Sequence, residues 1–272
     1  MNFFDALILG LLQGLTEFLP VSSSGHLVLG QTVLGVLQAD NITFEIFVHF
    51  GTLFSILAIF WKDVWQIFSS LFKGLKNPGN IPSLLKNDEH FRLAALIVVG
   101  SIPAAVIGLL FKPFVERAFA DVSLVGVMLI VTGLVLFLTR LAKPKPDKKV
   151  GWGTAIFIGF AQAFAILPGI SRAGMTISAG LFSGVAREQA ARYSFLLALP
   201  AIFGATLLET FEITGTPIER EFIFTLIVGT VAACIAGYVA IKTVFIVLKR
   251  DKFSYFSFYC LAVGLIVILL SS

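Results

Sequence analysis

Two polar turns in an otherwise apolar chain carry the side chains best suited to chemistry. The first runs Gln13-Gly-Leu-Thr-Glu-Phe-Leu-Pro-Val-Ser-Ser-Ser-Gly-His26, and the second runs Pro168-Gly-Ile-Ser-Arg-Ala-Gly-Met-Thr176. Together they supply a carboxylate, an imidazole, a guanidinium and several hydroxyl groups. A guanidinium presents a planar fork that suits phosphate oxygens, and an imidazole exchanges protons near neutral pH. The set therefore favours an anionic, phosphorylated ligand.

The spacing within each turn indicates how these groups are aimed. Gln13 and Glu17 are four residues apart, so they share one face of a short helix. The serines at 22–24 lie between a proline and a glycine, where a helix start leaves backbone N–H groups free. A helix beginning near Ala173 would add its positive dipole end. If the two turns meet, Glu17 and His26 lie against Arg172.

Structural explanations also exist for these residues. Glu17 could tie helix ends together, Arg172 could simply pair with it, and His26 could be a hydrogen-bonded core histidine. Serines beside Pro and Gly form turns more often than they act as nucleophiles. Glu45 and His49 are four residues apart in a later apolar stretch, and supporting roles suit them best.

The sequence contains no pattern typical of several other kinds of site. Histidines and carboxylates are not spaced for zinc, no Gly-x-x-x-x-Gly-Lys phosphate loop occurs, and no organic cofactor is expected. Cys234 and Cys260 lie in apolar runs and predict no disulfide framework. The formal net charge of +4 is too small to predict a nucleic-acid partner.

The composition places these turns in a membrane protein. Of the 272 residues, 57% are apolar and 13% are charged, and the mean hydropathy is +0.95. A soluble domain carries about twice that charged fraction. A membrane helix needs about 20 mostly apolar residues, and six stretches qualify, roughly 43–61, 93–112, 122–140, 193–210, 222–241 and 254–270.

Two further apolar regions, 3–35 and 152–184, are broken in the middle by Pro, Gly and polar residues. We expect each to form a re-entrant hairpin, because irregular backbone at membrane depth must be buried in protein or line a wet cavity. Short, tilted spanning helices are the alternative.

The two broken regions are copies of each other, which predicts an internal duplication. In both, a glutamine and a later glycine are twelve residues apart, with Leu-Pro and a serine between them. Repeat one covers about 1–142 and repeat two about 150–272, within a single membrane domain of residues 1–272. One hairpin and three spans per repeat leave the second repeat inverted. The predicted fold class is therefore an all-α polytopic membrane protein with two inverted-topology repeats.

The distribution of charge gives the predicted orientation. Four loops on one side hold 16 of the 20 lysines and arginines, and by the positive-inside rule that side is cytoplasmic. The loops near Lys76 and Lys145 are then cytoplasmic, Glu219 is outside, and the first hairpin enters from outside. The four basic loops are 62–92, 140–150, 184–192 and 242–252.

The same motifs resemble a known family. Gln13-x-x-x-Glu17 with the following serines resembles the first signature of the undecaprenyl-diphosphatases, also called bacitracin-resistance proteins. Pro168 to Thr176 resembles the second signature, and the resemblance covers nearly the whole chain. Two positions depart from the family pattern, because Gln13 replaces the commoner glutamate and Ala173 stands where the signature has serine.

The resemblance implies roles for particular residues. Glu17 would be the single obvious charged ligand for a divalent cation, with Mg²⁺ or Ca²⁺ as the candidates, and no firmly held metal centre is expected. The implied catalytic residues are Glu17, Ser23, His26 and Arg172, with Ser171 and Thr176 as phosphate ligands; Gln13 and Ser22 complete the predicted substrate-binding set.

The function implied by the resemblance is that of an integral membrane phosphatase. It would hydrolyse undecaprenyl diphosphate to undecaprenyl phosphate and inorganic phosphate, and so recycle the lipid carrier of cell-wall synthesis. It would lie in the bacterial plasma membrane among membrane lipids, with its active site toward the periplasmic side, and an oligomer is compatible with it. The alternative is a transporter or flippase of an anionic polyprenyl phosphate lipid, since inverted repeats with broken helices are also a transporter plan.

Overall fold

The regular secondary structure is helical throughout the part of the chain that the structure describes. The structure, a computed structural model, describes residues 1–36, 41–119, 121–212 and 220–271, so Glu219 lies outside it. The helices are α1 Phe3–Phe18, α2 Ser23–Leu34, α3 Asn41–Ile59, α4 Trp61–Lys76, α5 Ile81–Asn87, α6 Glu89–Leu110, α7 Lys112–Phe119, α8 Val122–Leu138, α9 Trp152–Phe164, α10 Arg172–Phe182, α11 Arg187–Glu212, α12 Arg220–Lys249 and α13 Phe256–Ser271.

The predicted membrane-length helices form. Within the described residues, α6, α8, α11, α12 and α13 each contain a stretch long and apolar enough to cross a membrane. A sixth candidate is α3 taken together with α4, which bends away from it by 84°. The protein is therefore an all-α, multi-pass membrane protein, as the composition predicts.

Each broken region folds as two short helices joined by a polar turn. In the first, Ser22 ends the turn as the N-cap of α2 and accepts a hydrogen bond from Gly25 N–H at 3.4 Å. In the second, Ser171 caps α10 and accepts from Gly174 N–H at 3.0 Å. A capping serine satisfies a backbone donor that the helix start would leave free. Pro and serine in the turns therefore break each apolar region where the sequence predicts.

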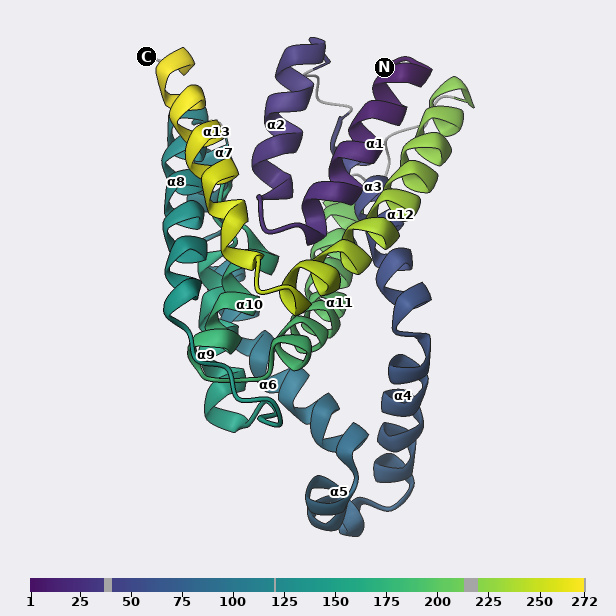
Figure 1. Cartoon of the computed structure of the whole chain (residues 1–272). Helices are drawn as coiled ribbons and strands as arrows, with labels where there is room; N and C mark the ends of the chain where they lie inside the picture. Colours follow the sequence, from purple (N-terminus) through teal and green to yellow (C-terminus); the bar gives the residue numbers. More distant parts are fainter. Residues whose placement is uncertain (37–40, 120, 213–219, 272) are drawn as a thin grey trace.

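Close contacts between glycines set how these short helices pack. A methyl group on Gly10 of α1 would lie 2.5 Å from the carbonyl oxygen of Gly229 in α12. A methyl group on Gly159 of α9 would lie 2.5 Å from the carbonyl oxygen of Gly100 in α6. Small residues let membrane helices approach this closely. As a result, the first helix of each hairpin runs along a long helix from the other half of the chain (Figure 1).

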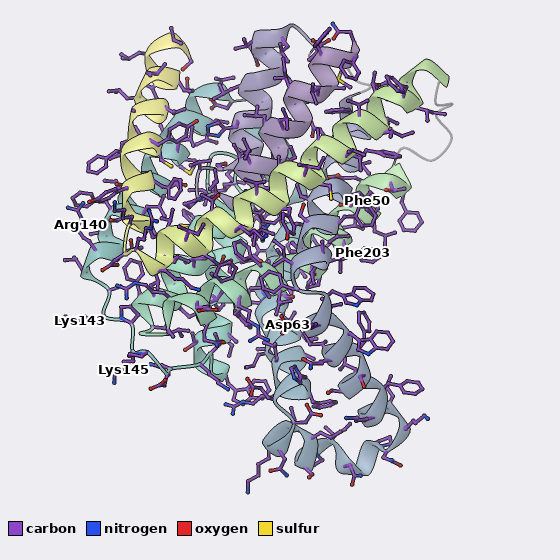
Figure 2. All side chains as sticks on the ribbon, turned by 45° about the vertical axis from the view of Figure 1, so that its right-hand side comes forward. Phe50, Asp63, Arg140, Lys143, Lys145 and Phe203 are labelled. Carbon is purple, nitrogen blue, oxygen red and sulfur yellow. The ribbon has the colours of Figure 1, made fainter. Side chains whose placement is uncertain are left out.

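The two ends of the molecule differ. Figure 1 shows both chain termini at one end and α4 and α5 at the other. Figure 2 shows Asp63 and the linker residues Lys143 and Lys145 in the half of the molecule away from the termini. The basic linker therefore lies away from the end at which α1 begins.

The segment 62–92, which the sequence analysis treats as a loop, contains helices α4 and α5. Helix α4 is amphipathic and α5 has only seven residues, so neither registers as a span by its own hydropathy. Ser70 of α4 donates hydrogen bonds to both carboxylate oxygens of Asp88, at 3.1 and 3.0 Å, and Asp88 caps α6. Asp63 of α4 also forms an ion pair with Arg192 of α11. These contacts hold α4 against the long helices.

Candidate active site

The two polar turns meet in the interior of the protein. Glu17 at the end of α1 and Arg172 at the start of α10 form an ion pair, with Oε1 and Nη2 2.6 Å apart. Their side chains are only 6% and 14% exposed, so both charges are largely removed from solvent. A buried charge needs a partner, and each supplies the other's. The predicted contact between Glu17 and Arg172 is thereby confirmed.

Glu17 is the centre of the site because three groups donate to its two carboxylate oxygens. Ser23 Oγ donates to Oε2 at 2.5 Å, and Gln13 Nε2 donates to the same oxygen at 3.0 Å. Arg172 holds the other oxygen. The carboxylate is therefore paired with the guanidinium and aimed at the Ser23 hydroxyl, which is the arrangement of a base beside a nucleophile.

His26 is held from both ring nitrogens. Nδ1 lies 2.8 Å from the Ser22 carbonyl oxygen and Nε2 lies 2.7 Å from the Tyr259 hydroxyl. Because a carbonyl can only accept, Nδ1 carries the proton, and Nε2 of the neutral ring accepts from Tyr259. The imidazole is buried and stacks on Tyr259. Its two ring nitrogens bond to Ser22 and Tyr259, so a direct role of His26 beside the guanidinium stays a prediction.

Tyr259 is a functional candidate that the sequence analysis missed. It comes from α13, at the far end of the chain from His26, and its ring lies nearly parallel to the imidazole, with centroids 5.6 Å apart. A single tyrosine in an apolar span carries no spacing signal. Only the packing of α13 beside the first hairpin brings it to the site.

The predicted substrate-binding hydroxyls are mostly engaged in holding the two turns. Ser22 and Ser171 cap their helices, as described above. Thr176 is fully buried and donates to the Arg172 carbonyl oxygen at 2.8 Å, with Ser194 Oγ 2.6 Å away. Thr132 of α8, which the sequence analysis also missed, accepts from Ser171 N–H at 3.1 Å. The roles of Ser22, Ser171 and Thr176 as phosphate ligands stay predictions.

Some hydrogen-bonding capacity at the site is unused. Nη1 of Arg172 and Oε1 of Gln13 are buried and have no partner among the described residues. Helices α2 and α10 both begin at the site, so their positive dipole ends face the same region. The site can therefore accept negative charge beyond that of Glu17.

The donor set does not fit a metal ion held by the protein alone. Among the residues that the structure describes, no three His, Cys, Asp or Glu side chains cluster as metal ligands. Glu17 is the one carboxylate of the site, and Arg172 already neutralises it. The unpaired Gln13 oxygen is a single weak ligand. We therefore derive no step through a metal.

Comparison with known proteins identifies sequences similar to this chain. Residues 6–266 match the family described as bacitracin resistance protein BacA. The chain is 48% identical to an undecaprenyl-diphosphatase of Desulforapulum autotrophicum, over 99% of this chain and 98% of the relative. It is 43% identical to the undecaprenyl-diphosphatase of Salinibacter ruber, over 97% of each chain. It is also 43% identical to that of Halothermothrix orenii, over 100% of this chain and 99% of the relative.

Proposed function

The chain belongs to the bacitracin resistance protein BacA family, and on that premise we propose that it is an undecaprenyl-diphosphate phosphatase. It hydrolyses undecaprenyl diphosphate to undecaprenyl phosphate and inorganic phosphate in the bacterial plasma membrane, and so returns the lipid carrier to cell-wall synthesis. The observation that carries the proposal is the buried carboxylate of Glu17, which joins the hydroxyl of Ser23 to the guanidinium of Arg172.

In the first step, Ser23 Oγ attacks the terminal phosphorus and Glu17 accepts its proton. A bond forms between Oγ and phosphorus, and the bridging P–O bond breaks to release undecaprenyl phosphate. In the second step, water attacks the phosphoserine, the Oγ–P bond breaks, inorganic phosphate leaves, and the proton returns to Ser23. A serine hydroxyl needs an adjacent base, and the 2.5 Å contact with Glu17 supplies one.

Arg172 stabilises the negative charge on the phosphoryl oxygens. Its Nη2 holds Glu17, while Nη1, buried and without a partner in the described structure, is available to a phosphate oxygen. Groups already aimed at the developing charge lower the barrier most effectively. With one nitrogen on Glu17 and the other on phosphate, the Arg172 guanidinium would bridge the base and the substrate. If both nitrogens were to bind the diphosphate, Arg172 would first have to release Glu17.

Two rival nucleophiles are His26 and a water molecule. For His26 to attack, Nε2 would have to leave the Tyr259 hydroxyl, whereas Ser23 needs no rearrangement. We therefore favour Ser23 and give His26 a supporting role, such as proton transfer in the second step. A divalent cation, Mg²⁺ or Ca²⁺, belongs to this proposal only as a companion of the substrate's phosphate oxygens, and Glu17 would be the charged side chain able to act as its ligand.

We further propose that the two halves of the chain are inverted repeats. The capping pairs Ser22–Gly25 and Ser171–Gly174 occupy equivalent positions 149 residues apart. The contacts of the hairpin glycines in α1 and α9 with long helices of the opposite half are likewise equivalent. In this proposal each hairpin is re-entrant. By the positive-inside rule the basic loops favour entry of the first hairpin from the periplasmic side, with the site reached from there.

The test is phosphate release from undecaprenyl diphosphate by the purified protein in detergent. We expect stoichiometric inorganic phosphate and undecaprenyl phosphate without any second compartment. A lipid transporter would release neither product in that assay. The transporter alternative is not favoured, since the relatives are named as diphosphatases.

A further inference from the structure

A groove of about 560 Å³ opens beside the candidate active site. Its walls come from the end of α1, the end of α12 and the start of α13. That volume is within the range of pockets that bind small molecules, about 300–1,000 Å³. The side chains lining it are mainly apolar and include Leu12, Leu15, Leu19, Val247, Phe256 and Tyr259.

The groove shares a wall with the site. Tyr259 lines the groove with its ring and donates its hydroxyl hydrogen to His26 Nε2 at 2.7 Å. Thr16, which also lines the groove, immediately precedes Glu17. A tyrosine is suited to such a boundary because one end of its side chain is apolar and the other is polar. A molecule that fills the groove therefore contacts the tyrosine that bonds to His26 and the residue next to Glu17.

The groove also faces outward from the helix bundle. Leu15 is 39% exposed and Tyr259 is 46% exposed, on helices that the composition places in a membrane. A hydrophobic chain can thus enter sideways from the bilayer without crossing water. The lining includes Lys252 in the basic turn that follows α12, so the groove extends toward the basic side of the molecule.

We propose that this groove, here called the prenyl groove, holds the first isoprenoid units of the substrate's lipid chain. The proposal rests on the proposed function. It adds where the lipid chain lies and which residues contact it. The chain is the occupant because in the proposed function it is covalently attached to the diphosphate at Arg172 and Ser23, and Tyr259 belongs to both the groove and that site. An acyl chain of the bulk membrane has no such attachment.

The groove selects the substrate's lipid chain by shape rather than by adding binding energy. Burying methylene groups stabilises a complex when they leave water, but a prenyl chain is already in lipid. The groove therefore adds little affinity through burial alone. It aligns the chain so that the terminal phosphorus reaches Ser23, and an obstruction should act by misplacing the substrate.

The first test fills the groove. Leu15→Trp should lower kcat/KM for undecaprenyl diphosphate by about tenfold or more, because overpacking a shaped site is costly. Leu134→Trp is the matched control, because Leu134 is a 52% exposed leucine of α8 that does not line the groove. We expect it to change kcat/KM by no more than about twofold. Equal effects of the two substitutions would overturn the proposal.

The second test does not depend on turnover. A leucine-sized diazirine amino acid in place of Leu15, which does not fill the groove, should cross-link to radiolabelled undecaprenyl diphosphate, and excess unlabelled diphosphate lipid should compete, whereas phosphatidylglycerol should not. In place of Leu134 it should give no such competed product. A cross-link at 15 that phosphatidylglycerol removes equally well would assign the groove to bulk lipid. If the wild type released no phosphate but the competed cross-link formed, the proposed function would fail and the groove assignment would stand.

Discussion

The Glu17 carboxylate gives Ser23 a different environment from its neighbour Ser24. Ser23 Oγ lies 2.5 Å from Glu17, whereas Ser24 Oγ contacts Ser22 Oγ at 3.3 Å. Both serines are partly exposed, so they form a matched pair for substitution.

Ser23→Ala should reduce phosphate release by more than the roughly 10²–10³-fold that loss of one stabilising donor costs. Ser24→Ala should stay within about twofold of wild type, as for other sites away from special features. The measurement is single-turnover phosphate release from undecaprenyl diphosphate. Activity of Ser23→Ala well above background, together with complete loss in His26→Ala, would make histidine the nucleophile instead.

Tyr259 orients His26 rather than touching phosphate in our proposal. Tyr259→Phe leaves Nε2 of a buried imidazole without its donor, which costs about 1–3 kcal/mol, equivalent to roughly 5–150-fold in rate. We expect the loss in kcat with KM nearly unchanged. Tyr255→Phe is the control, because Tyr255 lines the same groove without bonding to His26. An equal loss in both variants would show a groove effect instead.

The sequence predicted some of these residues and not others, for physical reasons. Glu17 and Arg172 stand out because buried charges need partners, and opposite charges in two matching turns pair. Tyr259 and Thr132 give no such signal, since neither carries a charge and both reach the site only through helix packing. Conversely, Thr176 was predicted from its type and motif position, but its hydroxyl bonds to the backbone of its own helix.

At the scale of elements, glycine contacts fix the hairpins against the long helices. Gly10→Ala would place Cβ 2.5 Å from the Gly229 carbonyl oxygen, so one backbone must move. We expect a loss of about 1–3 kcal/mol in the free energy of unfolding, as for other overpacked interfaces, seen as a lower Tm in detergent. Gly159→Ala should behave alike through Gly100. Gly204→Ala on α11 is the control, because a methyl group there meets no heavy atom within 4 Å.

The cap of α6 makes a pH-dependent contribution to stability. Burial alone would raise the pKa of Asp88, but hydrogen bonds from two backbone N–H groups and the Ser70 hydroxyl, with the nearby charge of Lys73, lower it overall. A carboxyl whose folded pKa lies below its unfolded value of about 3.9 stabilises the protein above that pH. This contribution is lost as the pH falls through the folded pKa.

Asp88→Asn keeps a capping oxygen but removes the titrating charge. We therefore expect the wild type to lose more stability than Asp88→Asn when the pH is lowered from neutral to about 3, close to the unfolded pKa. Thermal unfolding of both proteins at the two pH values measures the difference. Parallel losses would mean that Asp88 does not titrate differently in the folded protein.

Hydropathy predicted the elements that are apolar and long, because a span must bury about 20 residues in lipid. It did not predict α4 and α5. In α4, Trp61, Trp65 and Phe68 are exposed along one face, but the helix also carries Asp63 and lysines, so its average hydropathy is low although the helix is well formed. Amphipathic helices outside the span pattern need a periodicity analysis, which a span search does not make.

For the whole molecule, the placement of charge relative to the two ends makes the orientation testable. Both termini lie at one end (Figure 1), and the lysine-rich linker lies in the opposite half (Figure 2). Since lysine and arginine concentrate in cytoplasmic loops, we expect a cytoplasmic linker and periplasmic termini. In that orientation the first hairpin would open outward and give the site access to diphosphate lipid of the outer leaflet.

We expect a membrane-impermeant thiol reagent to separate Lys145→Cys from Glu219→Cys in intact cells. The background should lack the two native cysteines, Cys234, which is partly exposed, and Cys260, which is buried. Glu219→Cys should label directly, and Lys145→Cys only after the membrane is permeabilised, because the linker faces the cytoplasm. Labelling of Lys145→Cys but not Glu219→Cys in intact cells would reverse the orientation and place the first hairpin on the cytoplasmic side. Equal labelling of both positions without permeabilisation would put the linker and Glu219 on the same side, which an inverted pair of three-span repeats does not allow.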